Sequence, residues 1–177
     1  MRLLTPSRLV ALVAVAVAVV ALSVTLGIAS AGTSHTAKQA CVKGQALLER
    51  NKANVVAYYE TAFNDKNPEL AVKLYGGDEY IQHNPLAGNG FDAFIGFVKS
   101  FTAAFPDTHI DIRRVIAECD IVMTHGVLTG AEPVYGQFGS KVVDVFRLDK
   151  NGKIVEHWDV LARQVDPATS LNHNPEV

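Results

Sequence analysis

The chain has 177 residues, of which 49% are hydrophobic and 19% charged, and its formal net charge is −2. This size and composition fit one globular domain with an appendage. The absence of a basic run argues against a nucleic-acid-binding protein, and no cysteine or histidine spacing matches a zinc site.

Residues 1–31 have the pattern of a secretory signal peptide. Two arginines precede an unbroken apolar run from Leu9 to Leu22, and Ala29-Ser30-Ala31 is a small-x-small cleavage signal. An uncleaved membrane anchor is the alternative, because the apolar stretch approaches the length of about 20 residues that spans a bilayer. Either way the domain is expected outside the cytoplasm. Cleavage would leave a secreted protein with no membrane partner.

The mature chain would be more acidic than the precursor. Removing residues 1–31 takes away two arginines and leaves 14 basic against 18 acidic residues, a net charge of −4. The only two cysteines, Cys41 and Cys119, would then lie in an oxidising compartment, where they could form a disulfide. The sequence alone does not give the distance between them.

The first half of the domain is predicted to be helical. After a polar lead-in over residues 32–50, Asn51 or Asn54 is expected to cap a helix whose apolar residues follow helical spacing as far as Phe63. A second short helix should begin at Pro68, a residue favoured at the first helical position, and end at Gly76-Gly77. An extended segment around Tyr80 and a glycine-rich loop over residues 87–90 precede a third helix, over residues 91–105.

From Thr108 onward the alternation of side chains predicts strands. Two strands are expected over residues 108–118 and 121–129, followed by a loop over 130–139 and a hairpin over 141–161. Residues 167–177 should form a loose tail. The predicted domain, residues 51–166, is therefore of the α+β class, with helices first and then a meander of four long strands. A strongly twisted sheet of this kind could wrap around the helices.

The hairpin turns at Asp149-Lys150-Asn151-Gly152, where Asn-Gly supplies the positive φ angles of a tight turn. A three-residue loop would place Asp144 opposite Trp158, whereas a two-residue loop would place it opposite Asp159. We favour the first register, because it sets a carboxylate between aromatic rings on one face of the sheet. His157 and Asp159 would then face the side away from Trp158.

Asp144 is the strongest candidate for a functional residue. It stands between Val143 and Val145 in a strand that should be largely buried, so its ionised form needs a partner. A carboxylate in such a place could carry out general acid–base chemistry on a carbon acid or a carbonyl group. The alternative is a structural ion pair, for instance with Arg113 or Arg147.

Two histidines are weaker candidates. His125 lies in the middle of a strand among apolar residues, a place more often taken by a hydrogen-bonded core residue than by a catalytic one. His83 precedes Asn84-Pro85 at the mouth of a loop, where it could either bond the backbone of the turn or enter a pocket.

Four segments of the domain carry a resemblance to a known family. They read Y-I-Q-H-N-P, F-P-D, R-V-I-A-E-C-D and D-V-F-R-L-D-K-N-G-K-I-V-E-H-W-D-V. Together they resemble the SnoaL-like polyketide cyclase family, within the nuclear-transport-factor-2-like superfamily, over about residues 51–165. The resemblance implies a cone-shaped α+β barrel in which a curved antiparallel sheet, wrapped around N-terminal helices, encloses an apolar pocket. Relatives usually carry glycine where this chain has Cys119.

The resemblance also implies a chemistry. In the characterised cyclases an aspartate and a histidine on pocket-facing strands assist a cofactor-free intramolecular aldol closure, and by strand position these look like Asp144 and His125. The implied activity is lyase or isomerase-type chemistry on a small hydrophobic carbonyl compound. Asp144 would move the proton, and His125 would polarise or orient the substrate.

Further expectations concern the pocket, cofactors and assembly. His83, Tyr80 and Trp158 are expected to shape the substrate pocket. Neither a metal nor another cofactor is expected, and the protein should form a homodimer through the outer face of its sheet. A non-catalytic domain that binds a small hydrophobic molecule is the alternative function, because a shared fold does not carry function with it.

Overall fold

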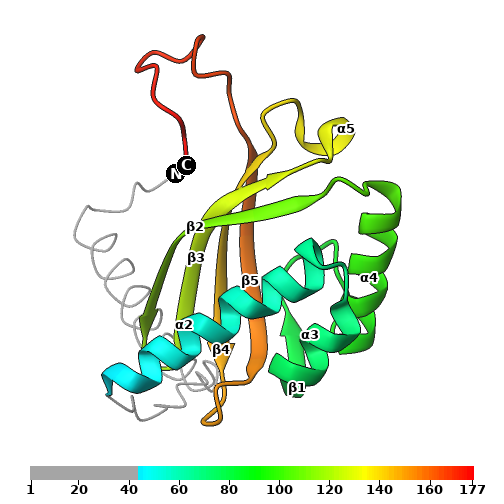
Figure 1. The fold of residues 1–177 in the computed structure, drawn as a ribbon, viewed down its shortest axis with the longest axis vertical. Helices are drawn as coiled ribbons and strands as arrows, with labels where there is room; N and C mark the ends of the chain where they lie inside the picture. Colours follow the sequence, from blue (N-terminus) through cyan, green and yellow to red (C-terminus); the bar gives the residue numbers. More distant parts are fainter. Residues whose placement is uncertain (1–43) are drawn as a thin grey trace, which may run out of the picture. The chain divides into compact units, whose positions relative to one another are not determined.

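The computed structural model describes residues 44–177, which belong to the unit formed by residues 40–177 (Figure 1). The predicted signal peptide, most of the lead-in and Cys41 lie outside these residues. In chain order the elements are α2 (Gln45–Tyr59), the π-helical turn η1 (Glu60–Asn64), α3 (Pro68–Tyr75), β1 (Gly76–Gln82), α4 (Phe91–Ala104), β2 (His109–Glu118), β3 (Ile121–Thr129), α5 (Glu132–Tyr135), β4 (Ser140–Leu148) and β5 (Ile154–Arg163). Within residues 44–177, none of the helices has the length and apolar character needed to cross a bilayer.

Helix α2 begins earlier than predicted, and neither predicted cap caps it. It starts at Gln45, so Asn51 and Asn54 lie inside the helix. The amide of Asn54 instead donates to the carbonyl of Gly152 at 2.8 Å, and the guanidinium of Arg50 donates to the carbonyl of Lys150 at 3.3 Å. These polar side chains fix the hairpin turn against the helix, a long-range role that local sequence does not reveal.

The start of α3 agrees with the prediction. The side chain of Asn67 accepts a hydrogen bond from the backbone N–H of Leu70 at 3.1 Å, and Pro68 occupies the first turn. The helix ends at Tyr75, and the backbone of Gly76 is extended. Its end therefore leads directly into β1, a strand that the sequence indicated only as a short extended segment.

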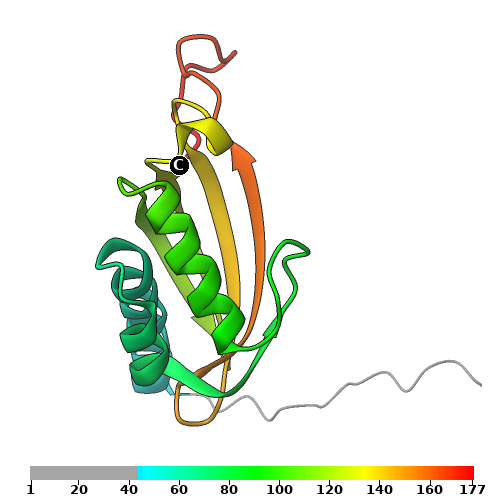
Figure 2. The same ribbon diagram turned by 90° about the vertical axis from the view of Figure 1, so that its right-hand side faces the viewer.

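The five strands form one mixed sheet in the order β1-β5-β4-β3-β2. The predicted meander from β2 to β5 is antiparallel throughout. Strand β1 adds a fifth member, which pairs in parallel with β5. The sheet curves but stays open, and α2, α3 and α4 cover one of its faces (Figures 1 and 2). The fold is therefore the predicted α+β class, with a curved and unclosed sheet packed against the helices.

The hairpin of β4 and β5 corrects the predicted register. Its loop has the favoured three residues, since the N–H of Asp149 donates to the carbonyl of Lys153 at 2.8 Å, and Gly152 takes a positive φ of 79°. Beyond the loop, however, Arg147 pairs with Glu156 while Leu148 pairs with Ile154. The extra residue in β5 is a bulge. It shifts the pairing by one, so Asp144 lies opposite Asp159 rather than Trp158.

An aromatic core fills the space between the helices and the sheet. The ring of Tyr58 stacks on Phe94 at 5.0 Å between centroids, and Tyr59 meets Phe146 edge to face at 5.2 Å. All four side chains are buried. Such rings contribute both apolar burial and specific geometry, and they hold α2 and α4 in fixed positions over the sheet.

Two peripheral features bear on earlier predictions. The tail expected to be loose returns to the sheet, where Glu176 pairs with Lys141 and accepts from the N–H of Val165 at 2.8 Å. Cys119 takes a φ of 56° in the turn between β2 and β3, a left-handed conformation that favours glycine. Its pairing with Cys41 involves a residue outside those described and stays a prediction.

Candidate active site

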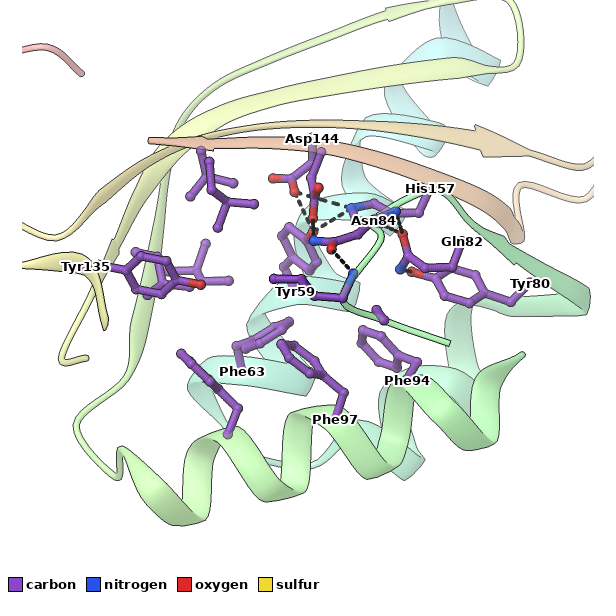
Figure 3. A pocket seen from close by; sticks show the side chains of 18 residues that line it. Tyr59, Phe63, Tyr80, Gln82, Asn84, Phe94, Phe97, Tyr135, Asp144 and His157 are labelled. Atoms are coloured by element: carbon purple, nitrogen blue, oxygen red, sulfur yellow. Dashed lines mark hydrogen bonds and ion pairs between the residues drawn. The ribbon is translucent and has the colours of Figure 1, made fainter. Parts of the chain in front are cut away.

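A pocket with a cavity volume of about 110 Å³ opens between α4 and the inner face of the sheet (Figure 3). Its walls are mainly apolar, and seven of its side chains are phenylalanine or tyrosine. A largely apolar cavity with a few polar groups at one place is the usual form of a small-molecule site. The lining residues are Tyr59, Phe63, Tyr80, Gln82, Asn84, Leu86, Ala87, Phe94, Phe97, Phe101, Ile110, Leu128, Tyr135, Val142, Asp144, His157, Asp159 and Leu161.

Asp144 lies on the sheet side of the pocket and is 4% exposed. The hydroxyl of Tyr59 donates to its Oδ1 at 2.8 Å, and the hydroxyl of Thr124 donates to its Oδ2 at 3.0 Å. The arginines considered as structural partners are engaged elsewhere, Arg113 with Asp111 and Arg147 with Glu156. The alternative of a structural ion pair with either arginine is therefore wrong.

The partner of Asp144 is His157, on the neighbouring strand β5. Nε2 of His157 lies 3.3 Å from Oδ1 of Asp144 and 3.1 Å from the hydroxyl oxygen of Tyr59. On the other side of the ring, Nδ1 lies 3.0 Å from Oε1 of Gln82. That oxygen also accepts from the backbone N–H of Asn84 at 2.9 Å, which identifies it as an acceptor. Nδ1 of His157 must therefore carry a proton.

The number of protons in this cluster follows from its contacts. With Nδ1 protonated, a neutral His157 would present a lone pair at Nε2 to an oxygen of ionised Asp144, and the single proton of Tyr59 can satisfy only one of the two acceptors. A further proton on Nε2 or on the carboxyl group would satisfy both acceptors. We infer that Asp144 and His157 share this proton, either as an ion pair or as two neutral groups.

Two buried tyrosines lie beside this pair: Tyr59, which donates to Asp144, and Tyr80, whose ring stacks on His157. Burial, and then the nearby charge of Asp144, raise the pKa of Tyr59 well above its ordinary value of 10. The same two causes raise the pKa of Tyr80. Both phenols therefore keep their protons at neutral pH, and the hydroxyl of Tyr59 remains a donor at the buried end of the pocket.

Asp159 brings a second carboxylate to the same end of the pocket. Its Oδ2 accepts from the amide of Asn84 at 2.7 Å. Asp144, His157 and Asp159 each offer one ligand atom within 4.8 Å of the others, so these three residues could hold a metal ion.

Of the predicted pocket residues, Asp144 and Tyr80 line the cavity, and the other three do not. His125 points to the outer face of the sheet, where Nη1 of Arg114 donates to its Nδ1 at 3.1 Å. His83 and Trp158 stack on each other, with centroids 4.6 Å apart and planes at 4°. The predicted pair of Asp144 with His125 does not form, because the two side chains lie on opposite faces of the sheet.

Sequence reasoning missed His157 as the partner of Asp144. Strand alternation places His157 and Asp159 on one face of β5, but the favoured register assigned that face to the outside. The bulge after Ile154 turns this face toward the helices and turns Trp158 outward. Gln82 and Asn84 reach the site through the parallel pairing of β1 with β5, which no local pattern in the sequence indicated.

Comparisons with known proteins agree with this architecture. The profile of the SnoaL-like domain family matches residues 55–157. Among solved structures, a candidate polyketide cyclase from Acidithiobacillus ferrooxidans is 23% identical, with a TM-score of 0.54, and the match covers 64% of this chain and 89% of that one. A candidate SnoaL-like polyketide cyclase from Jannaschia sp. CCS1 is 20% identical, with a TM-score of 0.55, covering 67% and 90%. These identities establish the fold alone. No curated protein matches the chain.

Proposed function

The chain belongs to the SnoaL-like domain family, and from the pocket of this domain we propose that it carries out cofactor-free acid–base chemistry on a small hydrophobic carbonyl compound. The proposal keeps Asp144 as the residue that moves the proton and replaces His125 with His157 as its partner. Both groups lie at the buried end of one apolar cavity. A proton-transfer pair needs this arrangement, because both groups must reach the same substrate.

One observation carries the proposal: Nε2 of His157 lies 3.3 Å from Oδ1 of Asp144 in a buried site whose lining includes neither lysine nor arginine. Such a pair can accept or release one proton with little rearrangement. The hydroxyl of Tyr59 contacts both Asp144 and His157, so it can stabilise whichever of the two groups has lost the proton. The shared proton supports a role in proton transfer.

In the proposed step a C–H bond next to the substrate carbonyl breaks and its proton passes to the Asp144–His157 pair. The electron pair of that bond moves toward the carbonyl oxygen and forms an enolate. Tyr80 lines the pocket close to this pair and keeps its phenolic proton, so its hydroxyl is the donor suited to that oxygen. Return of the proton to carbon, or attack of the enolate on a second carbonyl group, would complete an isomerisation or an aldol closure.

The test is exchange of the proton next to a carbonyl group for deuterium. Cyclohexanone, acetophenone and α-aminoacetophenone would be incubated with the protein in buffered D₂O and followed by NMR. The wild type should accelerate exchange for at least one ketone. Asp144→Asn and His157→Gln should each lower that rate at least about 100-fold, the low end of what general acid–base catalysis contributes. Asp78→Asn, which changes an exposed residue of β1, should leave the rate unchanged.

The alternative, a binding module, predicts a different result. Ligands would then bind the pocket while their C–H protons exchanged at the rate of the buffer. Asp144→Asn would alter binding or stability but no rate. Binding without exchange for every ketone in the series would therefore replace the enzyme proposal with the binding proposal.

We also propose that the protein is exported and forms a homodimer through the outer face of its sheet. The apolar N-terminal segment with its Ala-Ser-Ala signal supports export. Support for the dimer comes from apolar side chains on that face, among them Ile116 at 58% and Val160 at 68% exposure. Val145 and Trp158 lie on the same face, opposite each other on β4 and β5.

A further inference from the structure

The pocket has an unbalanced charge. Its eighteen lining residues include Asp144, Asp159 and His157 but no lysine or arginine. His157 faces Asp144, so Asp159 is the carboxylate of the pocket that forms no ion pair with a basic side chain of residues 44–177.

The contacts of Asp159 leave it able to meet a ligand. One oxygen accepts from the amide of Asn84 at 2.7 Å, and within residues 44–177 neither a lysine, an arginine nor a histidine forms an ion pair with it. It also stands directly opposite Asp144 across the two strands. Like charges in such a cross-strand pair are destabilising, so the fold alone gives no reason to place a carboxylate there.

The negative charge acts across the cavity. Burial, and then the charge of Asp159, raise the pKa of Tyr135, which lies on the far side of the pocket from Tyr80 (Figure 3). Asp159 also contributes to the raised pKa of Tyr80, after burial and Asp144. The cavity between these two tyrosines thus lies in a negative potential.

Aromatic rings form most of the remaining surface of the cavity. Tyr59, Phe97 and Tyr135 face the space beside the carboxylates from three directions (Figure 3). A cation near aromatic faces is attracted by their quadrupoles, and this attraction is stronger in a partly desolvated site. A carboxylate without a cationic partner, opposite aromatic faces, suits a ligand with an ammonium group on a small apolar body.

We propose that this pocket selects small hydrophobic amines, with Asp159 as the counter-ion of the protonated amino group and the aromatic walls as the site of the apolar body. The inference rests on the proposed function in using the same pocket, and it narrows the proposed carbonyl substrates to those that also carry an amino group. Carboxylates and phosphates are excluded as ligands by the charge of Asp159. Neutral alcohols can bond to Asp159 but do not neutralise it.

Three probes of nearly equal size test the proposal: benzylamine, benzyl alcohol and benzoate, titrated calorimetrically at neutral pH. The proteins are the wild type, Asp159→Asn, and Asp78→Asn as a control that removes one exposed charge from β1. Wild-type protein should bind benzylamine at least about tenfold more tightly than benzyl alcohol and should bind benzoate weakest. Asp159→Asn should bring the amine and the alcohol to within about threefold, with alcohol affinity kept. The Asp78→Asn control should behave as the wild type.

Several outcomes would overturn the proposal. The first three are equal affinity for the amine and the alcohol, tightest binding of benzoate, and an amine preference that survives in Asp159→Asn. The fourth is failure of benzylamine to bind below about 10 mM, a concentration range that a ligand of this size should reach. Displacement of benzylamine by Zn²⁺ or Mg²⁺ at lower concentration would assign Asp159 to a metal instead. Because benzylamine has no carbonyl group, these results are independent of deuterium exchange, so either proposal can fail alone.

Discussion

Replacing Tyr59 with phenylalanine tests whether the Asp144 cluster is built as described. The substitution keeps the buried ring, which packs edge to face on Phe63 and Phe146, so no cavity forms. It removes only the hydroxyl, which donates to Asp144 at 2.8 Å and contacts His157 at 3.1 Å. The effect therefore reports the hydrogen bonds alone.

Its size can be estimated from the partners. A hydrogen bond to a charged group contributes about 1.5–3 kcal/mol, and Asp144 is too buried for water to replace the lost donor fully. We therefore expect Tyr59→Phe to lower the free energy of unfolding by about 1.5–3 kcal/mol. For a domain of this size, that corresponds to a fall in melting temperature of roughly 5–12 °C.

The neighbouring Tyr58 supplies a matched control. It lies on the same helix and is fully buried, but its hydroxyl has no hydrogen-bond partner within the part of the chain that the structure describes. Removing a buried and unsatisfied polar group relieves a desolvation cost. Tyr58→Phe should therefore leave stability unchanged or raise it by about 1 kcal/mol.

The assay is urea unfolding, followed by the fluorescence of the single tryptophan, Trp158. Both variants should keep the wild-type slope; Tyr59→Phe should lower the urea midpoint, and Tyr58→Phe should leave it unchanged or raise it. If Tyr59→Phe is as stable as the wild type, or if Tyr58→Phe is the more damaging change, the hydrogen bonds assigned to the cluster are wrong.

Three further predictions concern pH, assembly and processing. Burial raises the pKa values of Tyr58, Tyr59 and Tyr80 in the folded state. Their contribution to stability is therefore complete below the unfolded-state pKa near 10 and is lost as pH rises above it. Urea midpoints that stay level from pH 9 to about pH 11 would contradict this. Val160→Lys should convert a dimer into a monomer in light scattering, because it places a charge on the apolar outer face, and an unchanged mass would exclude this face. N-terminal sequencing of exported protein should begin at Gly32, whereas membrane-bound protein that keeps its first residues would show an uncleaved anchor.

Local signals in the sequence predicted much of the fold. Asn67 and Pro68 start α3 as expected, because capping and the fixed φ of proline act within one turn. The alternation in β4 placed Asp144, Phe146 and Leu148 on one buried face, which the structure confirms. The order of helices and strands predicted the α+β class, and the resemblance to the SnoaL-like family implied the same fold, which the family match and the solved relatives also support.

The partners of Asp144 depend on non-local pairing, and here prediction from sequence failed. A single bulge beside Ile154 decides whether His157 or Trp158 shares the pocket with Asp144, and a bulge changes few residue preferences in its own strand. His125 was misplaced because both faces of β3 carry apolar residues. Its inner face, with Thr124 and Gly126, is no more hydrophobic by sequence than its outer face, with Met123 and Val127.

The state of His157 tests the central claim most directly, because the proposed chemistry depends on one proton held between His157 and Asp144. Nitrogen-15 NMR of the imidazole, assigned with the His157→Gln variant, reports which ring nitrogen is protonated. Near neutral pH we predict a proton on Nδ1, bonded to Gln82, and a second proton signal between Nε2 and Asp144 that disappears in Asp144→Asn. A neutral ring with its only proton on Nε2, unaffected by Asp144→Asn, would contradict the shared proton and the acid–base function built on it.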